Sequence, residues 1–542
     1  MKRNASVFVD FIERVSEPYA DNLDWWVESP ASRNLITSGL YYNLCCIQFF
    51  KEIIELEDIG YVLVESLELK KILESVVTLK QIEVNVRCTE KHSLARGIKN
   101  ISIFFIRELI RNIIFLACGK KNHKINNDEE IIIIDKFVTP DSELVERYYC
   151  GLLEYVDVEV KKNIYFVPTL TGYFLRHYPA AFSILREDEQ QYLFKEDYLC
   201  PSDYIFALMH LIRLRNISIK NAFFLGIDVS ELIKEELHSV ENTSSSHIAL
   251  LNYCFFKRLK KNNIKIRRIV SWFENQVVDK GWNAGVRDNY PDVENVGYQG
   301  FADISPMHQN VYPTNLEKKL KIIPKTIAVI GEAYKDEVMK FCSDINVIIA
   351  PAFRFKWLWN ENSNSLDQSH TTILIAYALN TRSIVESLVM ISKCIDKIDN
   401  QKYRWLIKFH PASDVNILKG LVGEKWNKKF VVVDNHMSDC LSSCDILIGD
   451  GASSVCMEAL AKGVPVILPI TLNGYQFNPF PDRLSDKFYK VINTEDEMIE
   501  AIVALSENKD DYQQCDADDV RDLYFLKPDK ENSMRFLGFP IE

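Results

Sequence analysis

Short apolar runs along the chain alternate with longer segments in which apolar residues recur every three or four positions. Strands of a buried parallel sheet read as short continuous apolar runs, whereas helices show the longer period, so this alternation predicts a parallel α/β architecture. The region 70–126 is long for a single crossover, and we expect it to hold a helical insertion. The strands predicted in the first half are Val7–Val9, Tyr61–Val64, Ile131–Ile134, Ile164–Val167, Ala222–Leu225 and Ile266–Val270.

A polar, turn-rich stretch from Gly281 to Lys325 follows, and its prolines and glycines predict an interdomain connection. We expect a first domain at 1–310, a second at 311–510, and a tail at 511–542 that packs back on the first domain. The pattern predicts two Rossmann-type domains whose parallel sheets face an interdomain cleft. The second series of apolar runs comprises Ile327–Ile330, Val347–Ile349, Thr372–Ala378, Trp405–Lys408, Phe430–Val433, Ile446–Ile448 and Val464–Leu468.

Composition narrows the class of protein. A chain of 542 residues exceeds what one core supports, and its net charge of −12 argues against a broad nucleic-acid-binding surface. The thirteen cysteines show no repeated metal-ligand spacing, which favours reduced thiols in a cytoplasm. We expect no metal site, because the Asp516-Ala517-Asp518 triplet lies in an acidic tail without a preceding strand. No apolar run near the N-terminus is long enough for a signal peptide.

The most apolar segment, Ile101–Cys118, contains Arg107, Glu108 and Arg111 at helical spacing. These charges predict an amphipathic helix and exclude a membrane span. The helix either faces the core or lies on a membrane surface, with Lys120 beside it. We therefore expect a cytoplasmic protein, and peripheral contact with the inner face of the plasma membrane stays open.

Two small hydroxyl residues, Ser453 and Ser454, follow the run Ile446–Ile448 and the turn residues Asp450 and Gly451. A turn of this kind that opens a helix offers free N–H groups to an anion, which predicts a phosphate site. The alternative is an ordinary helix cap. Glu458 follows one helical turn later, where it would accept hydrogen bonds from ribose hydroxyls or simply stabilise the helix start.

His410 ends another strand-like run, and Pro411 restricts the backbone that follows it. We expect its ring to donate to a phosphate or nucleobase and to neutralise or protonate a leaving group. Lys408, two residues earlier on the same face of the strand, would add positive potential.

The paired His-Pro and Ser-Ser elements resemble those of bacterial sialyltransferases and of transferases that use CMP-activated nonulosonic acids or Kdo. The resemblance implies that His410 and Pro411 contact the CMP moiety and that Ser453 and Ser454 contact its phosphate. The same elements also resemble the CDP-glycerol and CDP-ribitol phosphotransferases of teichoic-acid assembly. They therefore specify a cytidine nucleotide better than the transferred group, and they imply no cofactor besides the donor substrate itself.

A wider pattern favours the CMP-sugar alternative. The segments 24–34 and 272–276 resemble proteins of bacterial surface-carbohydrate gene clusters, and the two-domain arrangement resembles the GT-B glycosyltransferases. This resemblance implies a metal-independent enzyme that moves a nonulosonic acid or Kdo from CMP to a growing surface glycan, with an oligosaccharide or lipid-linked acceptor. The acidic-acidic-Gly motif that supplies the base in several sialyltransferase families is absent, so the base is not carried over.

Glu274 is our candidate base, because it follows the strand Ile266–Val270 and should face the cleft. The alternative is a helix-start carboxylate, and Asp303 and His308 are weaker candidates for the base.

Arg33 and Arg354 are candidates for binding the sugar carboxylate, because a guanidinium matches a carboxylate in a bidentate fork. Asn34 and Gln276 would contact the substrate beside them, and a purely structural Arg33 is the alternative. Three other functions stay open: a polyol phosphotransferase, a non-catalytic scaffold of the polysaccharide assembly complex, and a uridine-binding sugar-nucleotide 2-epimerase.

Overall fold

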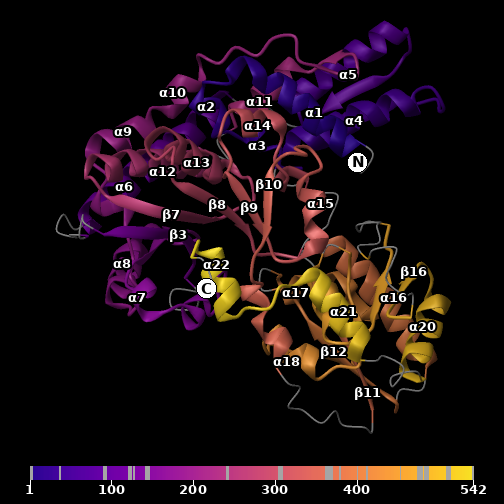
Figure 1. The fold of residues 1–542 in the computed structure, drawn as a ribbon. Coiled ribbons are helices and arrows are strands. Elements are labelled where there is room, and N and C mark those ends of the chain that lie inside the picture. Colours follow the sequence, from indigo (N-terminus) through magenta and orange to yellow (C-terminus); the bar gives the residue numbers. More distant parts are fainter. Residues whose placement is uncertain are drawn as a thin grey trace.

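The computed structural model describes residues 4–35, 38–89, 94–119, 125, 129–140, 147–239, 243–302, 309–360, 370–377, 380–398, 401–410, 413–451, 453–472, 480, 487–507 and 514–539. Pro411, Asp303 and His308 lie outside these ranges. The described chain contains two six-stranded sheets, each wholly parallel, which lie in the upper and lower parts of Figure 1. The predicted α/β fold class, with two Rossmann-type parallel sheets, is confirmed.

The first sheet has the order β10-β9-β8-β7-β3-β4. Numbered one to six along the chain, its strands take the order 2-1-3-4-5-6 from the β4 edge. In sheets of this type the strand order reverses between the first and third strands, and ligands bind beyond the carboxyl ends there. In this sheet that switch point lies between β3 and β7. The strands are β3 (Glu130–Val138), β4 (Ile164–Leu170), β7 (Lys265–Trp272), β8 (Glu294–Gln299), β9 (Thr326–Val329) and β10 (Asn346–Ile349).

The second sheet has the order β13-β12-β11-β14-β15-β16. This is the doubly wound 3-2-1-4-5-6 order, whose switch point lies between the first and fourth strands, here β11 and β14. The strands are β11 (Thr371–Ala376), β12 (Tyr403–Lys408), β13 (Phe430–Val432), β14 (Ile446–Ile448), β15 (Val466–Pro469) and β16 (Tyr489–Ile492).

The structure corrects the predicted domain boundary at 310–311. Strands β9 and β10, which were expected to begin the second sheet, pair in parallel with β8 and with each other in the first sheet. The predicted connection itself contains most of α13 (Val277–Asn289) and all of β8. The change of sheet therefore follows Ile349, through the 3-10 segment η8 (Phe353–Trp359).

A helical layer at the N-terminus replaces the strand expected at Val7–Val9. Residues 5–16 form α1 (Ala5–Ser16), because Phe8, Phe11 and Ile12 are buried at helical spacing. The region 70–126, where a helical insertion was expected, holds helices and strand β2, all of which precede β3, the first strand of the first sheet along the chain. The layer has its own hydrophobic core. Its elements are α1, α4 (Gly39–Ile53), α5 (Leu67–Lys80), α11 (Ser230–Leu237) and the small parallel sheet of β1 (Tyr61–Val64) and β2 (Asn85–Cys88).

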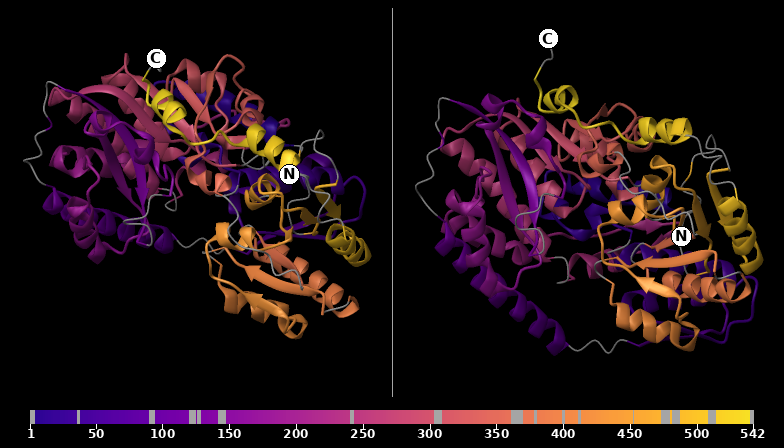
Figure 2. Two further views of the ribbon diagram at one scale, coloured as in Figure 1. Left: turned by 60° about the horizontal axis from the view of Figure 1, so that its bottom comes forward. Right: turned by 90° about the horizontal axis from the view of Figure 1, so that it is seen from below.

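Helices α12 (Thr243–Lys261) and α13 cross closely beside the first sheet (Figure 1). Gly281 permits this approach, since a Cβ there would lie 2.0 Å from the carbonyl oxygen of Ala249. Helix α6 (Leu94–Cys118) runs along the outside of the same unit, where Figure 2 shows it in dark purple in the right panel. No helix in the described ranges is both long and apolar enough to cross a membrane.

The described part of the tail returns to the first sheet. Leu526 N–H donates to the carbonyl oxygen of Ile330, and Ala352 N–H donates to that of Leu526. In α22 (Lys530–Phe536), the ring of Phe536 packs against Tyr298 of β8 at 5.3 Å. These contacts attach the last helix next to the connection between the two sheets.

Candidate functional site

Candidate residues lie at the carboxyl ends of strands in both sheets, close to the two switch points. Glu274 follows β7, which borders the switch point of the first sheet. Asp450 and the two serines follow β14, which borders that of the second, and His410 follows β12. Because ligands of open α/β sheets bind at these points, the topology makes these residues candidates for ligand binding.

The Glu274 carboxylate is half-buried and accepts hydrogen bonds from two residues close to it in sequence. Its Oε1 accepts from Trp272 Nε1 at 2.7 Å, and its Oε2 accepts from Gln276 Nε2 at 2.5 Å. Asp279 accepts from the backbone N–H groups of both Glu274 and Gln276 and completes a capping box at the start of α13. Each carboxylate oxygen retains acceptor capacity, so a substrate hydroxyl could still donate to it. Gln276, a predicted substrate contact, is thus the cap of α13.

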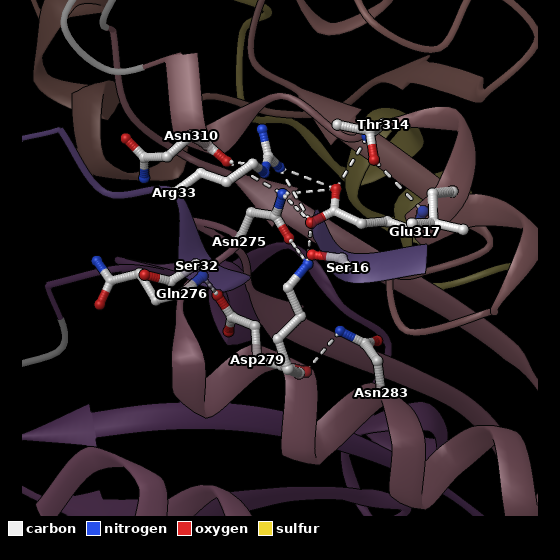
Figure 3. A network of polar contacts seen from close by, with 12 residues as sticks. Ser16, Ser32, Arg33, Asn275, Gln276, Asp279, Asn283, Asn310, Thr314 and Glu317 are labelled. Carbon is white, nitrogen blue, oxygen red and sulfur yellow. Dashed lines mark hydrogen bonds and ion pairs between the residues drawn. The ribbon is translucent and has the colours of Figure 1, made fainter. Parts of the chain in front are cut away.

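A buried polar network lies directly behind this turn (Figure 3). Asn275 has a left-handed backbone with φ of 57°, which turns its fully buried side chain inward, away from its neighbour Glu274. Its amide donates to the carbonyl of Asn310 at 3.0 Å and accepts from Lys280 Nζ at 2.5 Å. Lys280 also pairs with Glu317, whose carboxylate is the centre of the network.

Arg33 belongs to this network, which corrects its predicted role in binding a sugar carboxylate. Its side chain is only 2% exposed, and its Nη2 pairs with the Glu317 carboxylate at 2.9 Å. The same nitrogen donates to the carbonyl of Tyr312 at 3.2 Å. Asn34 beside it is half-buried. The carboxylate that matches the Arg33 guanidinium is therefore Glu317, 284 residues away in the chain.

The pKa values of the two buried acids Glu317 and Asp279 are shifted in opposite directions. Burial would raise the pKa of Glu317, but the charges of Arg33 and Lys280 outweigh that effect and lower the pKa to about 2. At Asp279 burial dominates and raises the pKa to about 8. Glu317 is therefore an ion between two cations, whereas Asp279 is largely protonated at neutral pH.

In the second unit, Ser454 and Glu458 contact each other. Ser454 Oγ donates to Glu458 Oε1 at 3.0 Å and makes no side-chain cap on α19 (Val455–Ala461), so the simple N-cap alternative does not describe it. Burial raises the pKa of Glu458, while Arg354 and the Ser454 hydroxyl act against that rise. Ser453 is half-buried, and its N–H donates to the carbonyl of Asp450 at 3.1 Å.

His410 has an exposed side chain at the end of β12, and Lys408 before it is half-buried. Desolvation of the ring and the positive charge of Arg354 both lower the pKa of His410. A neutral imidazole in this position can donate from one nitrogen and accept at the other.

Arg354 connects the two halves electrostatically. It is an exposed residue of η8, the segment between the two sheets. Its charge acts on His410 and Glu458 of the second unit and also on Tyr148 of the first. Burial raises the pKa of Tyr148, and the Glu274 carboxylate raises it further. One cation therefore lies within electrostatic range of two predicted nucleotide contacts, His410 and Glu458, and of the tyrosine beside the candidate base.

Aromatic rings line the carboxyl edge of the first sheet beside Glu274. The ring of Tyr148 lies 4.3 Å from that of Trp272 and 6.2 Å from that of Phe137. Such rings offer faces to apolar and CH-rich surfaces. From the sequence, Glu274 was predicted by its position after a strand and Arg354 by the chemistry of its guanidinium. Tyr148, Asp279 and Glu317 were missed, because only contacts in the folded chain identify them.

Among the described residues, no group of three or more histidine, cysteine, aspartate or glutamate side chains could hold a metal ion.

Solved structures of other proteins resemble this chain only at low sequence identity and low TM-score. No family model matches the chain, and no curated protein sequence matches it. A UDP-GlcNAc 2-epimerase from Neisseria meningitidis bound to UDP-GlcNAc matches with a TM-score of 0.44 and 11% identity, over 76% of this chain and 98% of that one. MurG from Acinetobacter baumannii has a TM-score of 0.38 and 10% identity, over 76% and 98% of the two chains. The trehalose-6-phosphate synthase OtsA has 0.44 and 11%, over 75% and 98%.

Proposed function

We propose that the protein is a glycosyltransferase that moves a nonulosonic acid or Kdo from a CMP-sugar donor to a bacterial surface glycan. The observation that supports this most is that Glu274, His410 and the serine pair all follow the carboxyl ends of strands at or next to the two switch points, with Arg354 in the segment between the sheets. The charge of Arg354 also lowers the pKa of His410 and opposes the rise in the pKa of Glu458. A donor phosphate beside Arg354 would lie between the two halves of the candidate site. The similar structures include proteins that act on UDP-sugars, and the cytidine preference rests on the His-Pro and Ser-Ser resemblance alone.

In the proposed reaction, Glu274 accepts a proton from an acceptor hydroxyl. The acceptor oxygen forms a bond to the anomeric carbon of the sugar, and the bond between that carbon and the donor phosphate breaks. Arg354 and His410 stabilise the charge that develops on the departing CMP, through hydrogen bonds from cationic or ring N–H groups. Of the two arginines predicted to bind the sugar carboxylate, Arg354 remains the candidate, because Arg33 is buried against Glu317.

A nucleotide-binding test separates this proposal from its competitors. We expect CMP to raise the melting temperature more than UMP, CDP or UDP, with about 2.7 kcal/mol of stabilisation at a hundredfold excess over Kd. Hydrolysis of a CMP-nonulosonate, compared with CDP-glycerol, then tests the transferred group. No stabilisation by any nucleotide would favour a non-catalytic scaffold, and preference for UDP would favour an epimerase-type activity. Preferential hydrolysis of CDP-glycerol would favour the polyol phosphotransferase.

A matched pair of arginine variants tests the position of the site. Arg354→Ala should weaken CMP binding, whereas Arg404→Ala should not, because Arg404 is exposed near the start of β12 and away from its carboxyl end. Equal loss in both variants would indicate a nonspecific charge effect and would count against the proposed site.

A further inference from the structure

The outward face of α6 is apolar, which is the reverse of an ordinary surface helix. Of the exposed positions between 101 and 118, one carries a charge, Arg107. Six carry large aliphatic side chains that are 38–60% exposed and recur at helical spacing. We call these six residues the α6 stripe: Ile103, Ile106, Leu109, Ile110, Ile113 and Leu116. At 1.5 Å per residue, the stripe extends for roughly 20 Å along the helix.

The neighbouring faces of α6 are buried. Phe104, Phe115 and Asn112 point into the unit, and the helix packs against α8 (Tyr178–Glu187) and α9 (Pro201–Leu208). The helix therefore already has its core contact, and the α6 stripe is a second apolar surface. Contiguous exposed apolar surface of this size marks an interaction site.

A cavity of 820 Å³ opens beside α6 at the carboxyl end of β4. Three arginines line it, and none of the described lining residues is acidic. Arg111 is 7% exposed and donates to Ser244 Oγ at 3.2 Å, while Arg107 and Arg176 are exposed. The buried carboxylate of Glu108 pairs with Arg107 and Arg111. This one negative charge only partly offsets the three positive charges of the arginines that line the cavity. The volume suits a small anionic ligand or headgroup.

The cavity and the α6 stripe share one helix. Arg107 and Arg111 line the cavity from α6, and Arg107 is adjacent in sequence to Ile106 of the stripe. A ligand with an anionic group in the cavity would therefore have apolar surface next to it. An anionic lipid in a bilayer has this chemistry, with basic residues at the headgroup level and aliphatic side chains below them.

A second copy of the chain fits the surface less well. The only acid described between 99 and 118, Glu108, is fully buried, so the exposed face of α6 offers no carboxylate to Arg107 of another copy. Each Arg107 already shares the Glu108 carboxylate with Arg111, so two copies packed through this face would bury positive charge that no further carboxylate of the face balances, which is costly. An anionic membrane surface supplies the missing negative charge.

We propose that this unit docks on an anionic lipid bilayer through the α6 stripe, and that the cavity holds a lipid headgroup phosphate between Arg107, Arg111 and Arg176. The cavity lies at the end of β4, two strands from the end of β7 that precedes Glu274. At about 4.8 Å between neighbouring strands, this is a separation of roughly 10 Å along one sheet edge. The docked lipid thus serves as the acceptor carrier, a role that rests on the proposed function, whereas docking itself does not.

Vesicle flotation of the full chain tests the docking. We expect binding to vesicles containing phosphatidylglycerol, weaker binding to pure phosphatidylcholine, and a decrease with added salt. Ile106→Glu with Ile113→Glu should abolish binding to both. Arg107→Ala with Arg176→Ala should lower the affinity for phosphatidylglycerol vesicles by about fivefold for each arginine. The weak binding to phosphatidylcholine should remain, so the preference between the two lipids is lost. Leu421→Glu, at an exposed leucine of α17 (Val415–Val422) in the other unit, should change neither.

Four outcomes would overturn the proposal. The first is wild-type protein that does not bind the vesicles or binds both kinds equally. The second is a loss of vesicle binding in the Leu421→Glu control equal to that of the isoleucine variants. The third is a stable dimer in light scattering that Ile106→Glu dissociates, since a second copy would then cover the stripe. The fourth is binding of free glycerol phosphate, lost in the arginine variants, without vesicle binding. Circular dichroism of the same variants confirms that they are folded, and CMP titration reports the nucleotide site separately.

Discussion

The two halves of the candidate site are built differently. On the first sheet, Glu274 belongs to a turn fixed by a capping box and by a buried ionic network centred on Glu317. On the second, His410 is exposed and the serine pair is half-buried, with Arg354 exposed between the sheets. The difference suggests a division of tasks: the first half is organised in advance by the fold, and the second leaves polar groups accessible to a ligand. Substitutions should therefore affect stability or chemistry in the first half and affinity in the second.

The largest effect is expected for Glu274→Gln. Loss of a general base typically lowers the rate by about 10²–10⁴-fold, and the amide carbonyl can still accept from Trp272, so the turn should remain folded. Transfer should fall by this factor while the Kd for CMP, measured by calorimetry, stays within about twofold, because binding and proton transfer involve different groups.

Glu294→Gln is the matched control, since Glu294 begins β8 at the opposite edge of the same sheet. Near-normal turnover of Glu274→Gln would exclude it as the base, and an equal loss in both variants would indicate general damage to the sheet.

The next effect is on stability. Glu317→Gln leaves Arg33 and Lys280 buried without their carboxylate, and breaking a buried pair in this way costs about 3–5 kcal/mol. Urea unfolding should show this loss, whereas Glu332→Gln, in an exposed pair with Lys335, should change the free energy of unfolding by less than about 1 kcal/mol. A small effect for Glu317→Gln would show that the network does not fix the turn.

The pH dependence follows from the lowered pKa of Glu317. Between its ordinary value of 4.5 and about 2, the unfolded chain binds a proton at this carboxylate and the folded chain does not. The stability it contributes is thus complete above pH 4.5 and is lost as the pH falls, by up to about 1.4 kcal/mol per unit. The free energy of unfolding, measured across this pH range, should fall less steeply for Glu317→Gln than for the wild type. Parallel curves for the two proteins would contradict the lowered pKa of Glu317.

The smallest effect is expected at Arg354. Removing a charged hydrogen-bond donor should weaken CMP binding by roughly 10–100-fold, while an exposed substitution should change stability by less than about 0.5 kcal/mol. Because the charge of Arg354 lowers the pKa of His410, Arg354→Ala should raise that pKa, which NMR titration of the imidazole can follow. An unchanged His410 titration would place the two groups out of electrostatic range.

Apolar runs predicted most strands because buried parallel strands carry few polar residues. The run Ile446–Ile448 coincides with β14, and Ile131–Ile134 lies within β3. The run Val7–Val9 was too short to distinguish strand from helix. Strand β8 was missed because Asn295 and Gln299 resemble loop residues. Their burial depends on distant partners, including the hydrogen bond from Asn295 Nδ2 to Asn283 Oδ1 at 2.6 Å.

In the candidate site, too, only features set by the local sequence pattern could be predicted. Glu274 and His410 could be selected from their positions after strands, since the edge of a parallel sheet is a property of the local pattern. The function of Arg33 could not be, because its guanidinium meets Glu317 only in the folded chain, and no local pattern specifies that pair. The assignment of His410, Ser453 and Ser454 to a nucleotide stays a prediction.

The most direct test is a crystal structure of the protein with CMP. We expect the phosphate within hydrogen-bond reach of Arg354 and the Ser453–Ser454 turn, with the His410 ring directed at the nucleotide and Glu274 facing the same space. CMP bound at another edge of the sheets, with Arg354 and His410 contacting solvent alone, would contradict it.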